Sequence, residues 1–183
     1  MSKEIKIGLI GAGWMGKAHT TAFHNARMIF GDDMPVFELV SDVSEDAVAK
    51  FAKNMGYNRY TTNWMDVVTD PEIDLVDVAT PNCMHYEMAK AALEHGKHVF
   101  CEKPLAPEAD ACKRIVEAEM ATGKQLVQVG RTGQQRNGTA VIQPLHRAHT
   151  VLEICPALIV FSLLLVNLLL LLICLLYTSP SPR

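Results

Sequence analysis

The sequence predicts an α/β fold for residues 1–130, with a doubly wound parallel sheet at its centre. Three observations support this fold class. Short runs rich in Val, Ile, Leu and Phe alternate with amphipathic stretches, a Gly-rich loop joins the first run to the first such stretch, and Pro and Gly mark the boundaries. Residues 131–183 lack this pattern, so we divide the chain near residue 130.

The predicted strands and helices alternate along the chain. Strands are expected at residues 5–10, 36–41, 75–80, 98–101 and 126–129, and helices at residues 14–27, 45–54, 63–68, 85–95 and 108–121. Such alternation places helices on both faces of a parallel sheet, with right-handed crossovers between the strands. Asp70-Pro71, Gly96 and Gly123 fall at turn or cap positions between these elements.

The composition favours an ordinary domain in a reducing compartment. The chain has 183 residues, a formal net charge of −3 and five cysteines. A mildly acidic chain of this size gives no reason to expect nucleic acid or an anionic membrane as a partner. The cysteines form no C-x-x-C pair and no metal-ligand spacing, and no signal peptide precedes the first strand. We therefore expect a cytoplasmic location and no metal site.

The segment from Gly11 to Gly16 has the pattern G-x-G-x-x-G, with Trp14 and Met15 between its last two glycines. In this pattern Gly11 permits a tight turn, Gly13 lets phosphates approach the backbone, and Gly16 lets the helix pack closely on the strand. The positive end of the helix dipole then faces the anion. The motif predicts a dinucleotide-binding segment that includes these five residues, and a purely structural turn is the alternative.

Asp42 follows the second predicted strand and is a candidate for cofactor selection. A carboxylate at this position accepts hydrogen bonds from both hydroxyls of the adenosine ribose and repels a 2′-phosphate, so it favours NAD over NADP. The alternative is a turn or helix-capping role, which Ser44 supplies equally well. The interval from Gly16 to Asp42 is longer than usual, and residues 31–33 are interpreted as a loop insertion.

Two later motifs, combined with the glycine loop, carry a family resemblance. T-P-N at residues 80–82 is followed by His85, E-K-P at residues 102–104 follows the next predicted strand, and His19 follows the glycine loop. In this order and spacing, residues 3 to about 130 resemble the Gfo/Idh/MocA oxidoreductases, named for glucose–fructose oxidoreductase and inositol dehydrogenase. The resemblance implies a Rossmann domain that binds NAD.

The resemblance also implies roles for single residues. In the family the T-P-N loop lies beside the dinucleotide, and the lysine of E-K-P lies near the nicotinamide and the reacting carbon. The implied site residues are the cofactor contacts Thr80, Pro81, Asn82, His85, Glu102 and Pro104 and the catalytic Lys103, which also contacts the cofactor. A cis bond is expected before Pro104. His85 is expected to donate to a loop carbonyl, and His19 to support helix packing.

The chemistry of Lys103 agrees with the role that the resemblance implies. An ammonium beside an alcohol oxygen stabilises developing alkoxide character during hydride removal, or polarises the carbonyl in the reverse direction. The alternative is a surface lysine paired with Glu102. His95, Lys97 and His98 are interpreted as an exposed helix end and strand start, outside the site.

The resemblance implies the cofactor-binding half of an NAD-dependent dehydrogenase. Family members continue into a second α/β domain with most substrate contacts and the acid–base histidine, and nothing from Arg131 onward resembles it. The intact enzyme is expected to act on a secondary alcohol of a polyol, sugar or related carbohydrate and to oligomerise, whereas the fragment alone is expected to be inactive. The alternative is a dinucleotide-binding sensor or scaffold without chemistry.

The last third of the chain has a different character. Residues 157–177 form an apolar stretch long enough to span a bilayer core of ~30 Å. Residues 174–183, however, resemble the translation of a transposase-type sequencing adaptor. We therefore interpret residues 131–183 as an atypical tail from frame-shifted or adaptor read-through. The alternatives are a transmembrane helix over residues 157–177, which would tether the protein to a membrane, and a buried helix.

Overall fold

The sheet has six parallel strands in the order β3-β2-β1-β4-β5-β6. The computed structural model describes residues 4–30 and 35–129. The strands are β1 (Lys6–Ile10), β2 (Val36–Ser41), β3 (Arg59–Thr61), β4 (Leu75–Val78), β5 (His98–Cys101) and β6 (Leu126–Gln128). From β1 the chain builds outward to β3, then crosses back to β4 and builds outward to β6, so the predicted doubly wound class is confirmed.

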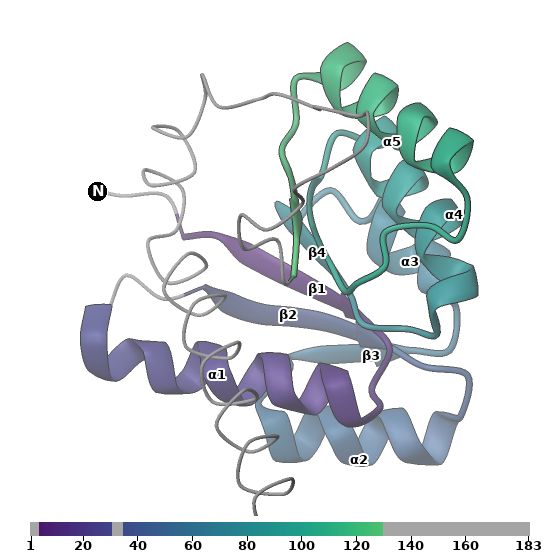
Figure 1. The fold of residues 1–183 in the computed structure, drawn as a ribbon. Helices are drawn as coiled ribbons and strands as arrows, with labels where there is room; N and C mark the ends of the chain where they lie inside the picture. Colours follow the sequence, from purple (N-terminus) through teal and green to yellow (C-terminus); the bar gives the residue numbers. More distant parts are fainter. Residues whose placement is uncertain (1–3, 31–34, 130–183) are drawn as a thin grey trace, which may run out of the picture. The chain divides into compact units, whose positions relative to one another are not determined.

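Helices cover both faces of this sheet. They are α1 (Trp14–Phe30), α2 (Glu45–Met55), α3 (Trp64–Thr69), α4 (Asn82–Glu94) and α5 (Ala109–Thr122). α1 and α2 lie together on one face, and α3, α4 and α5 lie on the other (Figure 1). The helix predicted over residues 85–95 starts three residues too late, because α4 begins at Asn82, directly after its N-cap residue Pro81.

The sequence does not predict β3. This strand has three residues at the edge of the sheet and pairs only with β2, from Leu39↔Arg59 to Ser41↔Thr61. Arg59 and Tyr60 are exposed, so the strand lacks the apolar run by which the inner strands are found. Its pairing with β2, rather than its composition, makes it a strand.

Caps fix several of the helix ends. The Ser44 hydroxyl accepts the N–H of Ala47 at 3.4 Å and caps α2. Ser44, and not Asp42, therefore supplies this cap. Gly123 ends α5 in the left-handed region with φ +66°, and Gly96 follows α4 with φ +75°, so both predicted turn glycines are confirmed.

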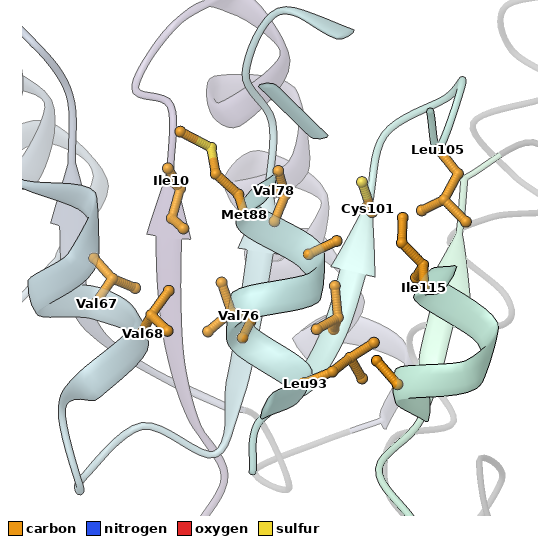
Figure 2. Packing of buried hydrophobic residues seen from close by; sticks show 14 of the residues in the cluster. Ile10, Val67, Val68, Val76, Val78, Met88, Leu93, Cys101, Leu105 and Ile115 are labelled. Atoms are coloured by element: carbon orange, nitrogen blue, oxygen red, sulfur yellow. The ribbon is translucent and has the colours of Figure 1, made fainter. Parts of the chain in front are cut away.

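An apolar core lies between the sheet and helices α3, α4 and α5. Side chains of a strand alternate between the two faces, so every second residue of β4 and β5 faces these helices. Val76, Val78, Val99 and Cys101 are fully buried there. The helix residues that pack on them include Met88, Leu93 and Ile115 (Figure 2). At about 1.5–3 kcal/mol for each large apolar side chain, this packing is the main force that holds the helices to the sheet.

The opposite face of the sheet carries aromatic rings and buried polar groups. Phe23 of α1 makes edge contacts with Phe37 and Phe100, with ring centroids 6.3 and 6.2 Å apart. Asp77 is the register partner of Phe100 in the β4–β5 pair and is 1% exposed. A charged group in the middle of a covered parallel sheet requires a partner, and α1 supplies it, as described below.

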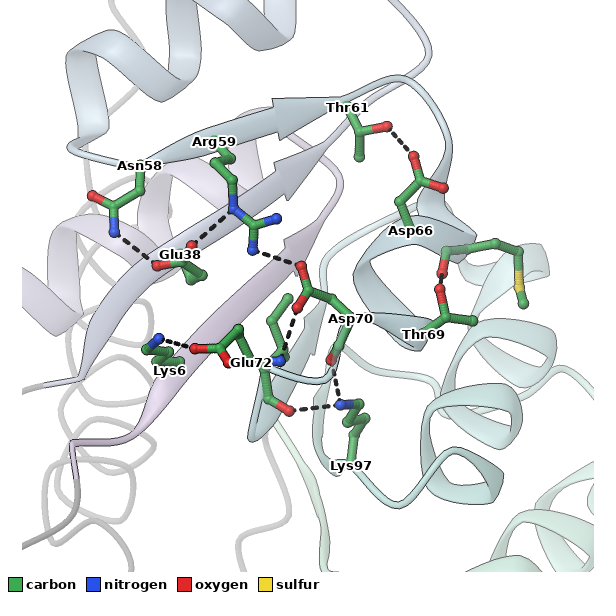
Figure 3. Close-up of polar contacts among 12 residues, drawn as sticks. Lys6, Glu38, Asn58, Arg59, Thr61, Asp66, Thr69, Asp70, Glu72 and Lys97 are labelled. Atoms are coloured by element: carbon green, nitrogen blue, oxygen red, sulfur yellow. Dashed lines mark hydrogen bonds and ion pairs between the residues drawn. The ribbon is translucent and has the colours of Figure 1, made fainter.

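Polar contacts at the amino ends of the strands hold the connecting segments (Figure 3). Arg59 donates to Glu38 at 2.8 Å and to Asp70 at 2.6 Å. The Lys97 ammonium donates to the backbone carbonyls of Asp70 and Ile73 and is buried. The interpretation of Lys97 as exposed is therefore wrong, because its stem packs inward while its charge is satisfied by carbonyl oxygens. His98 is likewise half-buried rather than exposed, whereas the expected exposure of the helix end before it is confirmed.

The described residues contain three free cysteines, Cys83, Cys101 and Cys112. None of the described helices combines the length and apolar character that a membrane span requires. The predictions for residues 131–183, including the alternative span at residues 157–177, lie outside the described residues.

Candidate functional site

Four segments that follow the carboxyl ends of β2, β1, β4 and β5 lie side by side. The backbone N–H groups of Gly11, Ala79 and Glu102 each donate to the last carbonyl of the neighbouring strand, at 2.9–3.0 Å. The direction of winding reverses between β1 and β4, and ligands of open α/β sheets bind at such a point. These segments bring together the predicted site residues Gly11, Gly13, Trp14, Met15, Gly16, Asp42, Thr80, Pro81, Asn82, His85, Glu102, Lys103 and Pro104.

The three glycines of the first segment differ in what their surroundings allow. Gly11 has φ +105°, and a Cβ there would lie 2.7 Å from the carbonyl oxygen of Ala79. A Cβ on Gly16 would lie 2.0 Å from the carbonyl oxygen of Gly11. A Cβ on Gly13 would meet nothing within 4 Å. Gly11 and Gly16 therefore build the turn, whereas Gly13 leaves the backbone open to a ligand.

The amino end of α1 is suited to an anion. The N–H of Lys17 donates to the carbonyl of Gly13 at 3.0 Å, which is the first bond of the helix. The N–H groups before Lys17 have no partner within the helix, and the first turn holds no acidic side chain. The partial positive charge of the helix end is therefore available to a phosphate group. Trp14, at the start of this turn, is 74% exposed.

Asp42 lies directly against the glycine loop. Its Oδ2 accepts the backbone N–H of Ala12 at 2.8 Å, and its own N–H donates to the carbonyl of Thr61 at 3.3 Å. The hydrogen bond to Ala12 holds one carboxylate oxygen at the loop, and the side chain is half-buried. The structure thus places a fixed carboxylate beside the backbone that borders the amino end of α1.

The T-P-N segment starts α4 and is tied to the E-K-P segment by His85. Pro81 and Asn82 are exposed, whereas His85 is 1% exposed. Its Nε2 lies 2.8 Å from the carbonyl oxygen of Thr80, and its Nδ1 lies 2.7 Å from that of Pro104. His85 therefore links two loops that are far apart in sequence, in keeping with the supporting contact expected of it.

The E-K-P segment has an exposed middle residue between anchored neighbours. The side chains of Lys103 and Pro104 are exposed, and the bond between them is cis, as expected. Glu102 is buried, and its Oε2 accepts the N–H of Lys103 at 2.8 Å. Its Oε1 lies 3.2 Å from Nε2 of His19 on α1. Glu102 thus forms an ion pair with the buried His19.

Comparison with known families identifies the family of this chain. Residues 5–131 match the family described as the oxidoreductase family with an NAD-binding Rossmann fold, Gfo/Idh/MocA. The chain belongs to this family. The predicted resemblance, the Rossmann fold and NAD as the family's cofactor are confirmed.

Individual relatives agree with this assignment. Levoglucosan dehydrogenase of Pseudarthrobacter phenanthrenivorans is 39% identical over 118 residues, which are 63% of this chain and 30% of that protein. Inositol 2-dehydrogenase/D-chiro-inositol 3-dehydrogenase of Shouchella clausii is 41% identical over 129 residues, or 69% and 35% of the two chains. A solved levoglucosan dehydrogenase in complex with NADH and L-sorbose superposes with a TM-score of 0.64 at 37% identity, covering 68% and 34%. This chain therefore spans about a third of the length of these relatives.

One cluster beside the candidate site was not predicted from the sequence. His19 is fully buried, and its Nδ1 lies 3.0 and 3.1 Å from the two oxygens of Asp77. The sequence reasoning placed His19 in helix packing and gave Asp77 no role. The signal was available, because alternation along β4 places Asp77 inside a sheet covered on both faces, where a carboxylate requires a cation or donors.

Charges within this cluster stabilise one another. Burial alone would lower the pKa of His19, but the charge of Asp77 and the hydrogen bonds with Asp77 and Glu102 outweigh burial and raise the pKa to about 10. Burial would raise the pKa of Glu102, but the hydrogen bonds from His19 and from the N–H of Lys103 lower it below its ordinary value. The contacts and the raised pKa of His19 favour an imidazolium that lies between the carboxyl groups of Asp77 and Glu102.

Proposed function

We propose that this chain is the cofactor-binding part of a dehydrogenase that moves a hydride between NAD and a secondary alcohol of a polyol, sugar or related carbohydrate. The observation that carries the proposal is the arrangement of charged groups across the carboxyl ends of the strands. Asp42 follows β2 on one side of the glycine loop, and Lys103 follows β5 on the other. The two strands are three spacings apart, or ~14 Å, which is the scale of an extended dinucleotide.

Each segment has a proposed part in binding. The N–H groups near Gly13 hold the pyrophosphate, and Asp42 accepts hydrogen bonds from the adenosine ribose. Thr80, Pro81 and Asn82 line the middle of the cofactor. NAD supplies the chemistry of hydride acceptance and return when it is bound. Trp14 and Met15 border the pyrophosphate, and His85, Glu102 and Pro104 form the remaining border of the cofactor site.

The Lys103 ammonium is proposed to act on the substrate oxygen. It stabilises negative charge on the alcohol oxygen as the hydride leaves, and it polarises the carbonyl in the reverse reaction. Its exposure supports this role, because the side chain is free to face a ligand while both neighbouring residues are anchored. The names of the relatives, which are levoglucosan and inositol dehydrogenases, support a polyhydroxylated substrate.

The remainder of the catalytic machinery is proposed to lie in sequence that this chain does not share with its longer relatives. The relatives are about three times as long, and the substrate contacts and acid–base group are assigned to that additional region. Residues 1–183 alone are therefore proposed to bind NAD without turnover. Residues 131–183 remain a proposed read-through tail, and a reducing cytoplasm remains the proposed location.

A sensor or scaffold that binds NAD without chemistry is the second candidate function. The E-K-P segment favours the dehydrogenase, because a binding module has no need of an exposed lysine held between two anchored residues. The two functions are distinguished in a protein extended to the length of the relatives. The dehydrogenase oxidises a polyol with NAD and loses about 100-fold or more in kcat on Lys103→Ala. The sensor shows no turnover in either form.

Titration calorimetry with NAD and NADP tests the cofactor assignment. The 183-residue chain is expected to bind NAD at least about tenfold more tightly than NADP, which corresponds to ~1.4 kcal/mol. Asp42→Ala is expected to remove this preference. Asp46→Ala is the matched control, because it removes an exposed carboxylate from the neighbouring helix α2 and is expected to leave the preference unchanged. Equal affinities in the unmodified chain would contradict the role of Asp42.

A further inference from the structure

His19 connects two parts of the site that are far apart in the sequence. It lies in the second turn of α1, whose amino end borders the glycine loop. One ring nitrogen contacts Asp77 of β4 at 3.0 and 3.1 Å, and the other contacts Glu102 after β5 at 3.2 Å. The ring also packs on Phe100, with centroids 5.2 Å apart. A single side chain thus joins the first helix to two strands of the other half of the sheet.

The geometry favours a positively charged ring. An ionised carboxyl group acts only as an acceptor, so a ring that faces two such groups donates from both nitrogens. A neutral imidazole has only one N–H and would leave one carboxylate buried without its donor. The raised pKa of His19 and the lowered pKa of Glu102 agree with this arrangement.

Glu102 connects His19 to the segment of Lys103. While Oε1 faces His19, Oε2 accepts the backbone N–H of Lys103 at 2.8 Å. On the other side of the lysine, the carbonyl of Pro104 lies 2.7 Å from Nδ1 of His85. The backbone of Lys103 is therefore fixed on both sides, from α1 through Glu102 and from α4 through His85.

We propose that His19 is a positioning residue that ties Glu102, and through it the backbone of Lys103, to the helix that binds the dinucleotide. The inference rests on the proposed function, which places Lys103 beside the cofactor. Hydride transfer depends on the relative placement of reacting groups, and small displacements reduce it strongly. A link between the pyrophosphate-binding helix and the lysine segment keeps the relative position of these two parts fixed.

A purely structural role for His19 makes a different prediction. A histidine that only fills the core beside Phe100 would affect the stability of the whole domain without a specific effect at Lys103. The matched control is Tyr57, whose hydroxyl lies 3.3 Å from that of Thr20, the next residue on α1. Tyr57→Phe also removes a buried hydrogen bond from this helix, but it does not touch Glu102.

The first test is hydrogen exchange by NMR on the 183-residue chain without nucleotide. In His19→Gln, exchange of the Lys103 amide is expected to accelerate at least about tenfold relative to the slowest amides of the core, because the uncharged amide of Gln cannot serve both carboxylates. In Tyr57→Phe the same ratio is expected to stay within about twofold of the unmodified chain. Equal ratios in the two variants would overturn the proposal.

A second measurement needs no variant and so does not depend on the folding of His19→Gln. Carbon-detected NMR follows the ring of His19, the side-chain carboxyl of Glu102 and the backbone nitrogen of Lys103 as the pH rises from 7. The other charged or titratable groups next to the cluster are Asp77, the Lys103 ammonium, whose charge acts on Glu102, and Cys101 and Tyr57, whose pKa values burial raises. All three signals are expected to change with one midpoint above the ordinary value for histidine.

If the chemical shift of the Lys103 backbone nitrogen did not change at the pH where His19 titrates, the proposal would be contradicted. These measurements are made without nucleotide, so their outcome is independent of cofactor binding. If the unmodified chain bound no NAD in calorimetry, the proposed function would fail instead. If it bound NAD but the two variants gave equal exchange ratios, only the positioning role of His19 would fail.

Discussion

Both ends of the sheet carry polar networks, but the two networks differ in how many of their charged groups are left able to bind a ligand. At the amino ends, the charges of Arg59 and Lys97 are directed at acceptors of this chain, and the connecting segments are closed by them (Figure 3). At the carboxyl ends, charged groups are held in place by one contact and remain available for another. Asp42 uses one oxygen on Ala12, and Lys103 is anchored only through its backbone.

This difference separates a structural network from a binding site. Each ion pair at the amino ends has one exposed partner, Arg59 or Glu72, so solvent screens it and it contributes modestly to stability. The carboxyl ends present unbonded N–H groups of α1, a glycine without neighbours and a half-buried carboxylate. The buried cluster of His19, Asp77 and Glu102 links α1 to the segment of Lys103 and, in our proposal, fixes these open groups relative to one another.

The largest expected effect distinguishes two glycines of the same loop. Gly16→Ala places a Cβ 2.0 Å from the carbonyl oxygen of Gly11, so the turn must open. We expect a loss of about 3 kcal/mol or more in the free energy of unfolding, together with loss of NAD binding. Gly13→Ala meets no atom within 4 Å and is expected to cost about 1 kcal/mol or less, while NAD affinity falls at least about tenfold.

Urea denaturation and calorimetry on both variants measure these two quantities separately. A stable Gly16→Ala variant with unchanged NAD affinity would contradict the role given to the close helix–strand contact. Unchanged affinity in Gly13→Ala would show that the pyrophosphate does not approach this part of the backbone.

The second prediction concerns a buried cation at the amino ends. Lys97→Met keeps the apolar stem but leaves the carbonyls of Asp70 and Ile73 without their donor. The expected loss in the free energy of unfolding is about 2–3 kcal/mol, with NAD affinity unchanged within about twofold. Lys6→Ala is the control, because Lys6 pairs with Glu72 at the surface, and its effect on both quantities is expected to be much smaller. If Lys97→Met lowered NAD affinity more than Lys6→Ala does, the claim that the amino ends do not take part in NAD binding would be contradicted.

The third prediction is a dependence of stability on pH that originates at the carboxyl ends. The pKa of His19 is raised from 6.5 to about 10 on folding, so the folded state holds one more proton than the unfolded state between these values. The stability that His19 contributes is complete below pH 6.5 and is lost as the pH rises toward 10, by up to about 1.4 kcal/mol per pH unit. Urea denaturation at pH 7, 8 and 9 measures this slope. Constant stability over that range would show that His19 is not held as a cation.

Much of the fold and part of the site follow from local sequence signals. The inner strands were predicted from apolar runs, and the glycine loop from residues within one turn, because burial and backbone conformation are encoded locally at these positions. The edge strand β3 and the buried Lys97 were missed, because each depends on contacts with distant segments rather than on its own composition.

The same distinction applies within the candidate site. Asp42 and Lys103 belong to recognisable motifs, so they could be proposed from the sequence. The pairing of His19 with Asp77 and Glu102 joins residues 58 and 83 positions apart, and no local pattern specifies such a pair. Only the alternation along β4 indicated that Asp77 required a partner.

The central claim is that the carboxyl ends of the strands bind the nucleotide and the amino ends do not. The most direct test is an amide NMR titration of the 183-residue chain with NAD. Signals of the glycine loop, Asp42, Asn82 and Lys103 are expected to shift together with a single dissociation constant, while those of Arg59 and Lys97 stay fixed. Shifts centred on Arg59 and Lys97, or no shift in the glycine loop at saturating NAD, would contradict the account.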